Sequence, residues 1–139
     1  NISGLDQNGA THTLADYKGK KLVVFFYPKA STPGCTAEAC DLRDNYNRFQ
    51  ANNYALLGVS ADSAKAQAKF IEKFDLPFPL LADEDKSVIQ AFGVWGPKKF
   101  MGREYDGIHR TTFVIDENGT IEEVISDVKT KAHAAQILK

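Results

Sequence analysis

A continuous apolar run from Leu22 to Tyr27, LVVFFY, constrains the fold of this chain more than any other segment. Its residues are β-branched, aromatic or leucine, and no polar residue alternates with them, so the run predicts a strand that is buried on both faces. Such a strand belongs to a sheet that is covered on both sides. The rest of the chain must therefore supply neighbouring strands and covering helices.

Strand-like and helix-like segments alternate along the whole chain, which favours one α/β domain over residues 1–139. Further strands are expected at residues 54–60, 80–81, 110–116 and 120–128, and helices at residues 33–49, 61–74, 86–92 and 129–138. The last two strands are joined by the hairpin signal Glu117-Asn118-Gly119. Residues 94–108 are rich in glycine and aromatic residues and remain unassigned. The inward positions expected in the terminal helix are Ala132, Ala135 and Leu138.

This order of elements matches a thioredoxin-like fold, in which a central mixed β-sheet of parallel strands and an antiparallel pair is flanked by helices. Many α/β folds share the order, so function has to be argued from particular residues.

Composition narrows the class of partner. The chain has 139 residues, 43% of them hydrophobic, and a net charge of -1, which argues against nucleic-acid or membrane-surface partners. No run approaches the roughly 18 apolar residues of a membrane span, and no signal-peptide pattern opens the chain, so we expect a cytoplasmic protein. Because the chain starts at Asn1 rather than at methionine, loss of a leader or a first strand is compatible with the sequence.

The segment after the apolar strand is suited to activating a thiol. Thr32 is a good N-cap, Pro33 suits the first helical position, and Cys35 then falls in the first helical turn. Backbone N–H groups and the positive end of the helix dipole favour a thiolate there. The second cysteine, Cys40, lies five residues further along the same expected helix.

Three other uses of the two cysteines compete with this interpretation. Residues five apart on a helix have Cα atoms roughly 8 to 9 Å apart, beyond the ~7 Å that a disulfide tolerates, so a permanent bridge conflicts with the helix. A zinc site lacks ligands, because the only other candidates are His12, His109 and His133, scattered along the chain. An inert buried cysteine suits Cys40 better than Cys35.

A cation beside the thiol would favour the thiolate further, and Arg110 is the candidate. It stands at the head of an expected strand whose neighbours could include the strand over Leu22 to Tyr27. The residues alone leave a solvated arginine at a strand end equally open.

The pattern Pro28-x-x-x-Thr32-x-x-Cys35 resembles the active-site signature of peroxiredoxins. With Cys40 five residues on, the segment is similar to the peroxiredoxin Q, or bacterioferritin comigratory protein, subfamily. The resemblance extends over essentially the whole chain, through Arg43-Asp44, Gly58-Val59-Ser60, LPFPLLAD at residues 76–83, FGVWG at residues 92–96 and RTTFVID at residues 110–116.

The resemblance implies a thiol peroxidase that reduces hydrogen peroxide and small organic hydroperoxides. Cys35 would be the peroxidatic cysteine, oxidised to a sulfenic acid, and Cys40 the resolving cysteine that forms a disulfide with it. Arg110 would match the family's active-site arginine, and Thr32 the hydroxyl that contacts peroxide and thiolate. Two further residues complete the expected site: Pro28, which would shield the thiolate, and Glu38, which would orient Arg110.

Because the helix separates the two thiols, resolution is expected to require local unfolding between Cys35 and Cys40. The resemblance further implies recycling by thioredoxin or a similar dithiol protein, a monomer, and no cofactor or metal. Three departures from the family pattern stand out: a shortened N-terminal hairpin, Gln67 where many relatives have histidine, and Ala30-Ser31 in place of a more acidic pair.

Two other functions remain open. A thioredoxin-like disulfide oxidoreductase would prefer a C-x-x-C motif, and here Thr32 stands three residues before Cys35. A catalytically silent thioredoxin-fold interaction module or holdase would show no Cys35-dependent consumption of peroxide.

Overall fold

A computed structural model describes residues 3–30, 32–100, 102–126 and 128–138. Its centre is a five-stranded sheet with the strand order β5-β4-β3-β8-β9. The strands are β3 (Lys21–Phe26), β4 (Tyr54–Ser60), β5 (Leu80–Ala82), β8 (Thr111–Ile115) and β9 (Ile121–Ile125). β3, β4 and β5 run parallel, β8 is antiparallel to β3, and β9 is antiparallel to β8. The expected mixed sheet is therefore confirmed.

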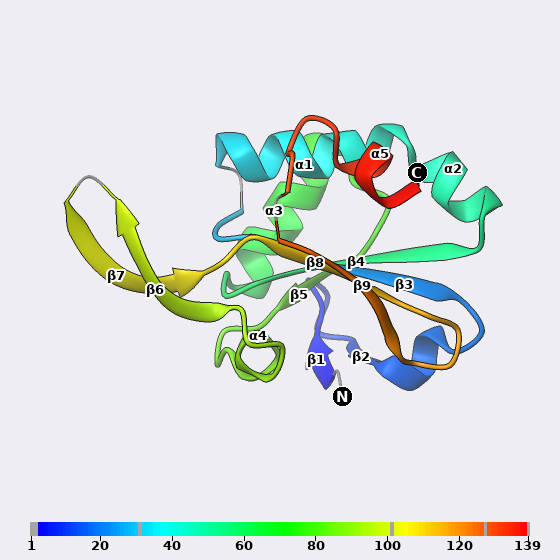
Figure 1. Cartoon of the computed structure of the whole chain (residues 1–139), viewed down its shortest axis with the longest axis horizontal. Helices are drawn as coiled ribbons and strands as arrows, with labels where there is room; N and C mark the ends of the chain where they lie inside the picture. Colours follow the sequence, from blue (N-terminus) through cyan, green and yellow to red (C-terminus); the bar gives the residue numbers. More distant parts are fainter. Residues whose placement is uncertain (1–2, 31, 101, 127, 139) are drawn as a thin grey trace.

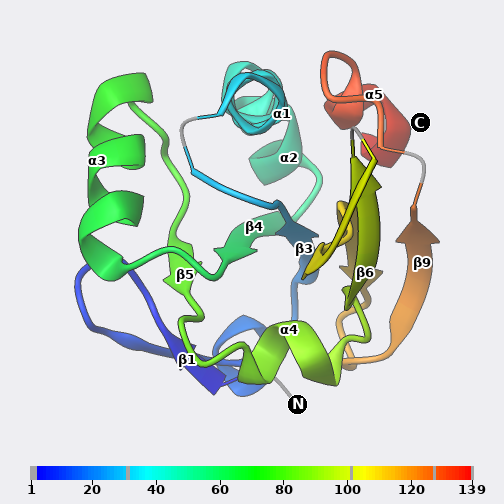
Figure 2. The ribbon, with the colours of Figure 1, turned by 90° about the vertical axis from the view of Figure 1, so that its left-hand side faces the viewer.

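The apolar run occupies the middle of this sheet, as expected. Every residue from Leu22 to Tyr27 is at most 1% exposed. Alternate side chains of the run enter two hydrophobic clusters on opposite faces of the sheet. Helices α1 (Pro33–Asp44), α2 (Tyr46–Ala51), α3 (Ala64–Phe74) and α5 (His133–Leu138) lie over one face, and α4 (Ser87–Ala91) lies over the other (Figures 1 and 2).

One expected helix is broken in two. The sequence predicted a helix through Phe49, but α1 ends at Asp44, and its C-cap Asn45 has a φ of -108° and a ψ of 12°, outside the helical region. The side-chain Nδ2 of Asn45 donates to the carbonyl oxygen of Asp41 at 2.8 Å. This local hydrogen bond competes with the helical backbone pattern, which is a typical behaviour of asparagine. α2 then starts in a new direction.

The terminal helix differs in both its start and its inward face. α5 begins at His133, and Ala132 and Ala135, which were expected to face inward, are exposed. The buried residues are instead His133, Ala134 and Ile137, while Leu138 is partly buried against the core. Ile137, which is larger than the alanines, occupies the core. The same helical register buries His133, one turn before Ile137.

The unassigned region 94–108 forms a hairpin of β6 (Trp95–Phe100) and β7 (Arg103–Ile108) that projects from the body of the molecule (Figure 1). A second small hairpin is formed by β1 (Ser3–Leu5) and β2 (Thr11–Thr13), followed by the 3-10 turn η1 (Leu14–Tyr17). Within the described ranges, no helix is long and apolar enough to cross a membrane.

Candidate active site

Strand pairing brings two distant segments to the same edge of the sheet. β3 is antiparallel to β8, with Phe26 opposite Thr111. The loop that follows β3 therefore lies beside Arg110, the residue that precedes β8. This confirms the expected neighbourhood of the two strands and places the guanidinium next to the start of α1.

Cys35 is the third residue of α1 and is only 2% exposed. The first hydrogen bond of the helix runs from the N–H of Thr36 to the carbonyl oxygen of Thr32 at 2.8 Å. The N–H groups before this bond belong to the helix start, where a negative charge is favoured. The sulfur is thus buried at the positive end of a 12-residue helix.

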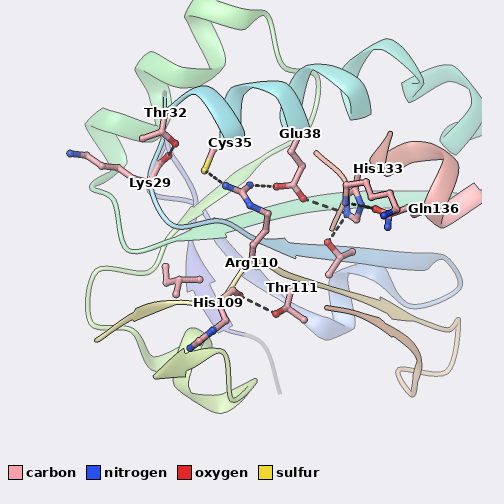
Figure 3. Close-up of polar contacts among 12 residues, drawn as sticks. Lys29, Thr32, Cys35, Glu38, His109, Arg110, Thr111, His133 and Gln136 are labelled. Carbon is pink, nitrogen blue, oxygen red and sulfur yellow. Dashed lines mark hydrogen bonds and ion pairs between the residues drawn. The ribbon is translucent and has the colours of Figure 1, made fainter. Parts of the chain in front are cut away.

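Arg110 bridges the thiol and an acidic side chain of the same helix (Figure 3). Its Nη2 donates to Sγ of Cys35 at 3.2 Å, and its Nη1 donates to Oε1 of Glu38 at 2.6 Å. Burial acts to lower the pKa of Arg110, but Cys35 and Glu38 outweigh it and raise that pKa. Arg110 is therefore a fixed cation that can accompany a thiolate.

The guanidinium approaches so closely because residue 34 has no side chain. A Cβ atom built on Gly34 would lie 3.2 Å from Nη2 of Arg110. This contact could not be predicted from the residues around Gly34, because it depends on Arg110, 76 positions away in the chain.

Glu38 is fully buried, and it carries the clearest electrostatic signature of the site. Burial raises the pKa of its carboxyl group to about 7, although the ion pair with Arg110 acts to lower it. Its second oxygen, Oε2, lacks a hydrogen-bond partner among the described residues. The nearest described ring nitrogen is Nε2 of His133, at 3.4 Å. The carboxylate thus connects the thiol region with the terminal helix.

The loop between β3 and α1 holds the remaining expected residues. Thr32 occupies the N-cap position, but its hydroxyl does not cap the helix; Oγ1 donates to the carbonyl oxygen of Lys29 at 2.8 Å. The lone pairs of this hydroxyl oxygen can still accept a hydrogen bond from a ligand. Pro28 is half-buried at the start of the loop.

A series of hydrogen bonds between polar side chains, which could not be predicted from the sequence, supports this loop. Oδ2 of Asp62 accepts hydrogen bonds from the N–H of Ala30 at 2.7 Å and from the hydroxyl of Ser60 at 2.6 Å. Ser60 in turn accepts from Nε2 of Gln67, whose Oε1 accepts from the hydroxyl of Tyr27. Gln67 therefore serves in this chain as a buried, fully hydrogen-bonded support for the loop.

Both cysteines are free thiols on the same helix. Cys35 is buried, whereas Cys40 is half-buried and does not belong to the core cluster around Cys35. The interpretation of Cys40 as an inert core cysteine loses its basis. Among the residues that the structure describes, no group of three or more metal-ligating side chains is assembled.

The arrangement combines a buried sulfur, a helix start and a permanent cation aimed at the sulfur. The helix start and the cation are the two features of this arrangement that activate a thiol as a nucleophile. Of the residues singled out from sequence, Cys35, Arg110 and Glu38 are in direct contact, with Thr32 and Pro28 on the adjoining loop. The sequence indicated His133 only as one of three scattered candidate zinc ligands and did not place it near the thiol. A prediction that this polar residue is buried in the terminal helix could have pointed to it.

Comparison with known proteins identifies the family. A model of the AhpC/TSA family matches residues 1–124. The chain belongs to the AhpC/TSA family. Peroxiredoxin Bcp of Escherichia coli K12 is 49% identical over 133 residues, which are 96% of this chain and 85% of that protein. Peroxiredoxin Bcp of Bacillus subtilis is 48% identical over 132 residues, covering 95% and 84%. The chain is accordingly a peroxiredoxin of the Q, or Bcp, type.

Solved structures of such peroxiredoxins have the same fold. A mutant of Xanthomonas campestris peroxiredoxin Q matches with a TM-score of 0.92 and 36% identity, covering 99% of this chain and 87% of that one. BcpB of Mycobacterium tuberculosis matches with a TM-score of 0.86 and 37% identity, covering 99% and 88%. The thioredoxin-like fold expected from sequence is confirmed, and family membership supports thiol-dependent peroxidase activity.

Proposed function

We propose that this peroxiredoxin reduces hydrogen peroxide and small organic hydroperoxides with Cys35 as the nucleophile. The observation that carries the proposal is the hydrogen bond from Arg110 Nη2 to the buried Cys35 Sγ at 3.2 Å, at the start of α1. Alkyl peroxide reduction is named as an activity of the similar Xanthomonas campestris bacterioferritin comigratory protein, which supports the inclusion of organic hydroperoxides.

In the first step, the Cys35 thiolate attacks the terminal oxygen of the peroxide. A sulfur–oxygen bond forms, the oxygen–oxygen bond breaks, and the departing oxygen takes up a proton to leave as water or an alcohol. Negative charge moves from the sulfur along this line, so donors fixed beside it stabilise the transition state. Arg110 and the N–H groups at the start of α1 are such donors, and Thr32 would orient the peroxide.

In the second step, the Cys40 thiol attacks the Cys35 sulfenic acid, and a disulfide and water are formed. The helical rise and rotation place Cα atoms five residues apart roughly 8 to 9 Å from each other, so the start of α1 has to unwind. Oxidation assists this unwinding. A neutral sulfenic acid is a weaker partner for Arg110 than a thiolate, and so the charge that holds the helix start is lost.

In the third step, a dithiol protein such as thioredoxin attacks the disulfide, leaves with the oxidising equivalents as its own disulfide, and restores both thiols. Pro28 is assigned the role of shielding the thiolate from solvent, and Glu38 that of orienting Arg110. The protein is proposed to act as a monomer in the cytoplasm.

The decisive experiment compares the wild type with Cys35→Ser and Cys40→Ser in peroxide consumption driven by thioredoxin and its reductase. We expect Cys35→Ser to lose all turnover, because no nucleophile remains. Cys40→Ser should consume about one equivalent of peroxide and accumulate sulfenic acid, detectable with a dimedone probe, but should fail to turn over.

Ala37→Ser is the matched control, since it also places a serine on α1 between the two cysteines and should retain turnover. Residual turnover in Cys35→Ser would contradict the nucleophile assignment. Full recycling in Cys40→Ser would contradict the intramolecular disulfide and point to an external thiol.

A further inference from the structure

Glu38 and His133 form a buried pair behind Arg110, contributed by α1 and α5. Both side chains are 0% exposed, and Oε2 of Glu38 lies 3.4 Å from Nε2 of His133. Figure 3 shows the succession from Cys35 through Arg110 and Glu38 to His133 and Gln136. The proposed peroxidase mechanism uses Arg110 directly but assigns no task to the histidine.

The proton on Nδ1 of His133 can be located from its partner. Oε1 of Gln136 accepts from the backbone N–H of Lys129 at 2.9 Å, which identifies that atom of the amide as the oxygen. The same oxygen lies 2.8 Å from Nδ1 of His133. Since an oxygen of this amide can only accept, Nδ1 must carry a proton.

The other ring nitrogen, Nε2, lies beside both a hydroxyl group and the carboxyl group of Glu38. If His133 is neutral, Nε2 accepts a hydrogen bond from the Thr112 hydroxyl, whose Oγ1 lies 2.7 Å away, and the lone pair of Nε2 also lies 3.4 Å from Oε2 of Glu38. A lone pair and an ionised carboxylate repel each other in a buried site. A proton on Oε2, or on Nε2, turns this repulsion into attraction.

We propose that Glu38 and His133 hold one shared proton, and that this proton makes the charge of Arg110 available to the Cys35 thiolate. With the proton, the pair is neutral and Arg110 balances the thiolate. Without it, the carboxylate and the thiolate share one cation, and a net negative charge is buried. His133 is thereby a positioning residue that acts on the sulfur through Glu38 and Arg110. The inference rests on the proposed role of Cys35.

The groups around the pair act in both directions. Asp41, on α1, raises the pKa of both members of the pair, whereas Arg110 lowers both. Burial lowers the pKa of His133 and raises that of Glu38, so that a neutral acid beside a neutral imidazole is favoured. On the hairpin side, Lys98 is a second cation. Burial and the charge of Arg110 lower the pKa of Lys98, whereas Cys35 acts to raise it.

The first test measures the alkylation rate of Cys35 by iodoacetamide in the Cys40→Ser background, where Cys35 is the only thiol. In His133→Gln an amide N–H that donates to Glu38 replaces the lone pair of Nε2, and this donor favours the ionised carboxylate. We expect the rate near neutral pH to fall by about tenfold. His109→Gln is the matched control, because His109 is exposed and lies outside the pair, and its rate should be unchanged.

Epistasis separates this role from a general structural effect. In a Glu38→Gln background, residue 38 has no charge to release, and so adding His133→Gln should no longer slow alkylation. An equal loss in both backgrounds would overturn the proposal. Circular dichroism of each variant checks that the comparison is between folded proteins.

The second test needs no substitution in the pair and follows His133 by nitrogen NMR. Nδ1 should be protonated throughout, and the titration of the pair should move to lower pH in Cys35→Ser, because the thiolate that favours the shared proton is gone. An unchanged titration, or a neutral ring with its proton on Nε2, would overturn the proposal. Neither test uses peroxide, so failure of the peroxidase function would be seen separately in turnover of the wild type.

Discussion

At the scale of a single residue, a substitution at Gly34 is expected to change helix stability and the reactivity of Cys35 in opposite directions. In Gly34→Ala, the new methyl group would lie 3.2 Å from Nη2 of Arg110, so the guanidinium has to move. The same change favours the helix, because alanine exceeds glycine in helix propensity by about 1 kcal/mol. We expect slower alkylation of Cys35, by several-fold, together with an equal or higher Tm.

Alkylation kinetics and thermal unfolding of the purified variant check these two effects separately. Unchanged alkylation would mean that Arg110 adjusts without loss. A lower Tm would mean that the crowding costs more than the helix gains.

The sequence predicted some contacts of the site and missed others for a physical reason. Arg110 was expected beside the thiol because of the resemblance to peroxiredoxins, whereas the residues alone left a solvated arginine at a strand end equally open. Asp62 and His133 were not predicted to join the site. The hydrogen bond from Ala30 to Asp62 and the approach of His133 to Glu38 depend on loop geometry and helix register, and neither has a local sequence signal.

At the scale of elements, α1 should respond to oxidation together with α5. Oδ2 of Asp41 accepts from the N–H of Ala134 at 2.7 Å, so the second half of α1 holds the start of α5. Formation of the disulfide should unwind α1 from Cys35 to Cys40. The strain should then reach Asp41, the next residue, and the N–H of Ala134.

Hydrogen exchange of the reduced and disulfide forms measures this response. We expect loss of protection in residues 35–41 and at Ala134, with β3 and β4 unchanged. Peroxide-treated Cys40→Ser is the control, since it is oxidised but cannot form the disulfide. Retained protection of α1 in the disulfide form would contradict the coupling between resolution and unwinding.

Elements with strong periodicity were predicted well, and those set by particular side chains were not. β4 matches its expected bounds, because Tyr54–Ser60 is a short apolar run without a competing pattern. α3 begins three residues later than expected, because Oγ of Ser63 accepts from the N–H of Ala66 and fixes the helix start. The β6–β7 hairpin could not be assigned, since its sequence shows no alternation, and Ile108 is the only buried residue among those of the hairpin whose burial is described.

At the scale of the whole molecule, Glu38 links stability to pH. Its pKa is raised from 4.5 to about 7 in the folded protein, mainly by burial. The stability associated with its neutral form is fully present below pH ~4.5 and is lost as the pH rises through about 7. Burial also lowers the pKa of His133 from 6.5. The stability associated with its neutral imidazole is therefore present above pH ~6.5 and is lost as the pH falls below that value.

Glu38→Gln isolates the first of these effects, because the amide cannot ionise. We expect the free energy of unfolding of the variant to gain on that of the wild type by roughly 3 kcal/mol between pH 4 and pH 8. Urea unfolding at several pH values measures the difference. A difference that stays constant with pH would contradict the assignment of a buried, neutral carboxyl group.

In the proposed mechanism, placing both thiols on one helix makes the unwinding of α1 compete with further oxidation of Cys35. In the proposed mechanism, a second peroxide would oxidise the Cys35 sulfenic acid irreversibly unless the first turns of α1 opened before that encounter. A more rigid start of α1 would hold the sulfur better for the first reaction and lengthen its exposure to the second. Gly34 has a lower helix propensity than alanine in this turn, so the proposed mechanism predicts that the highest peroxide concentration the protein survives depends on how readily the first residues of α1 unwind.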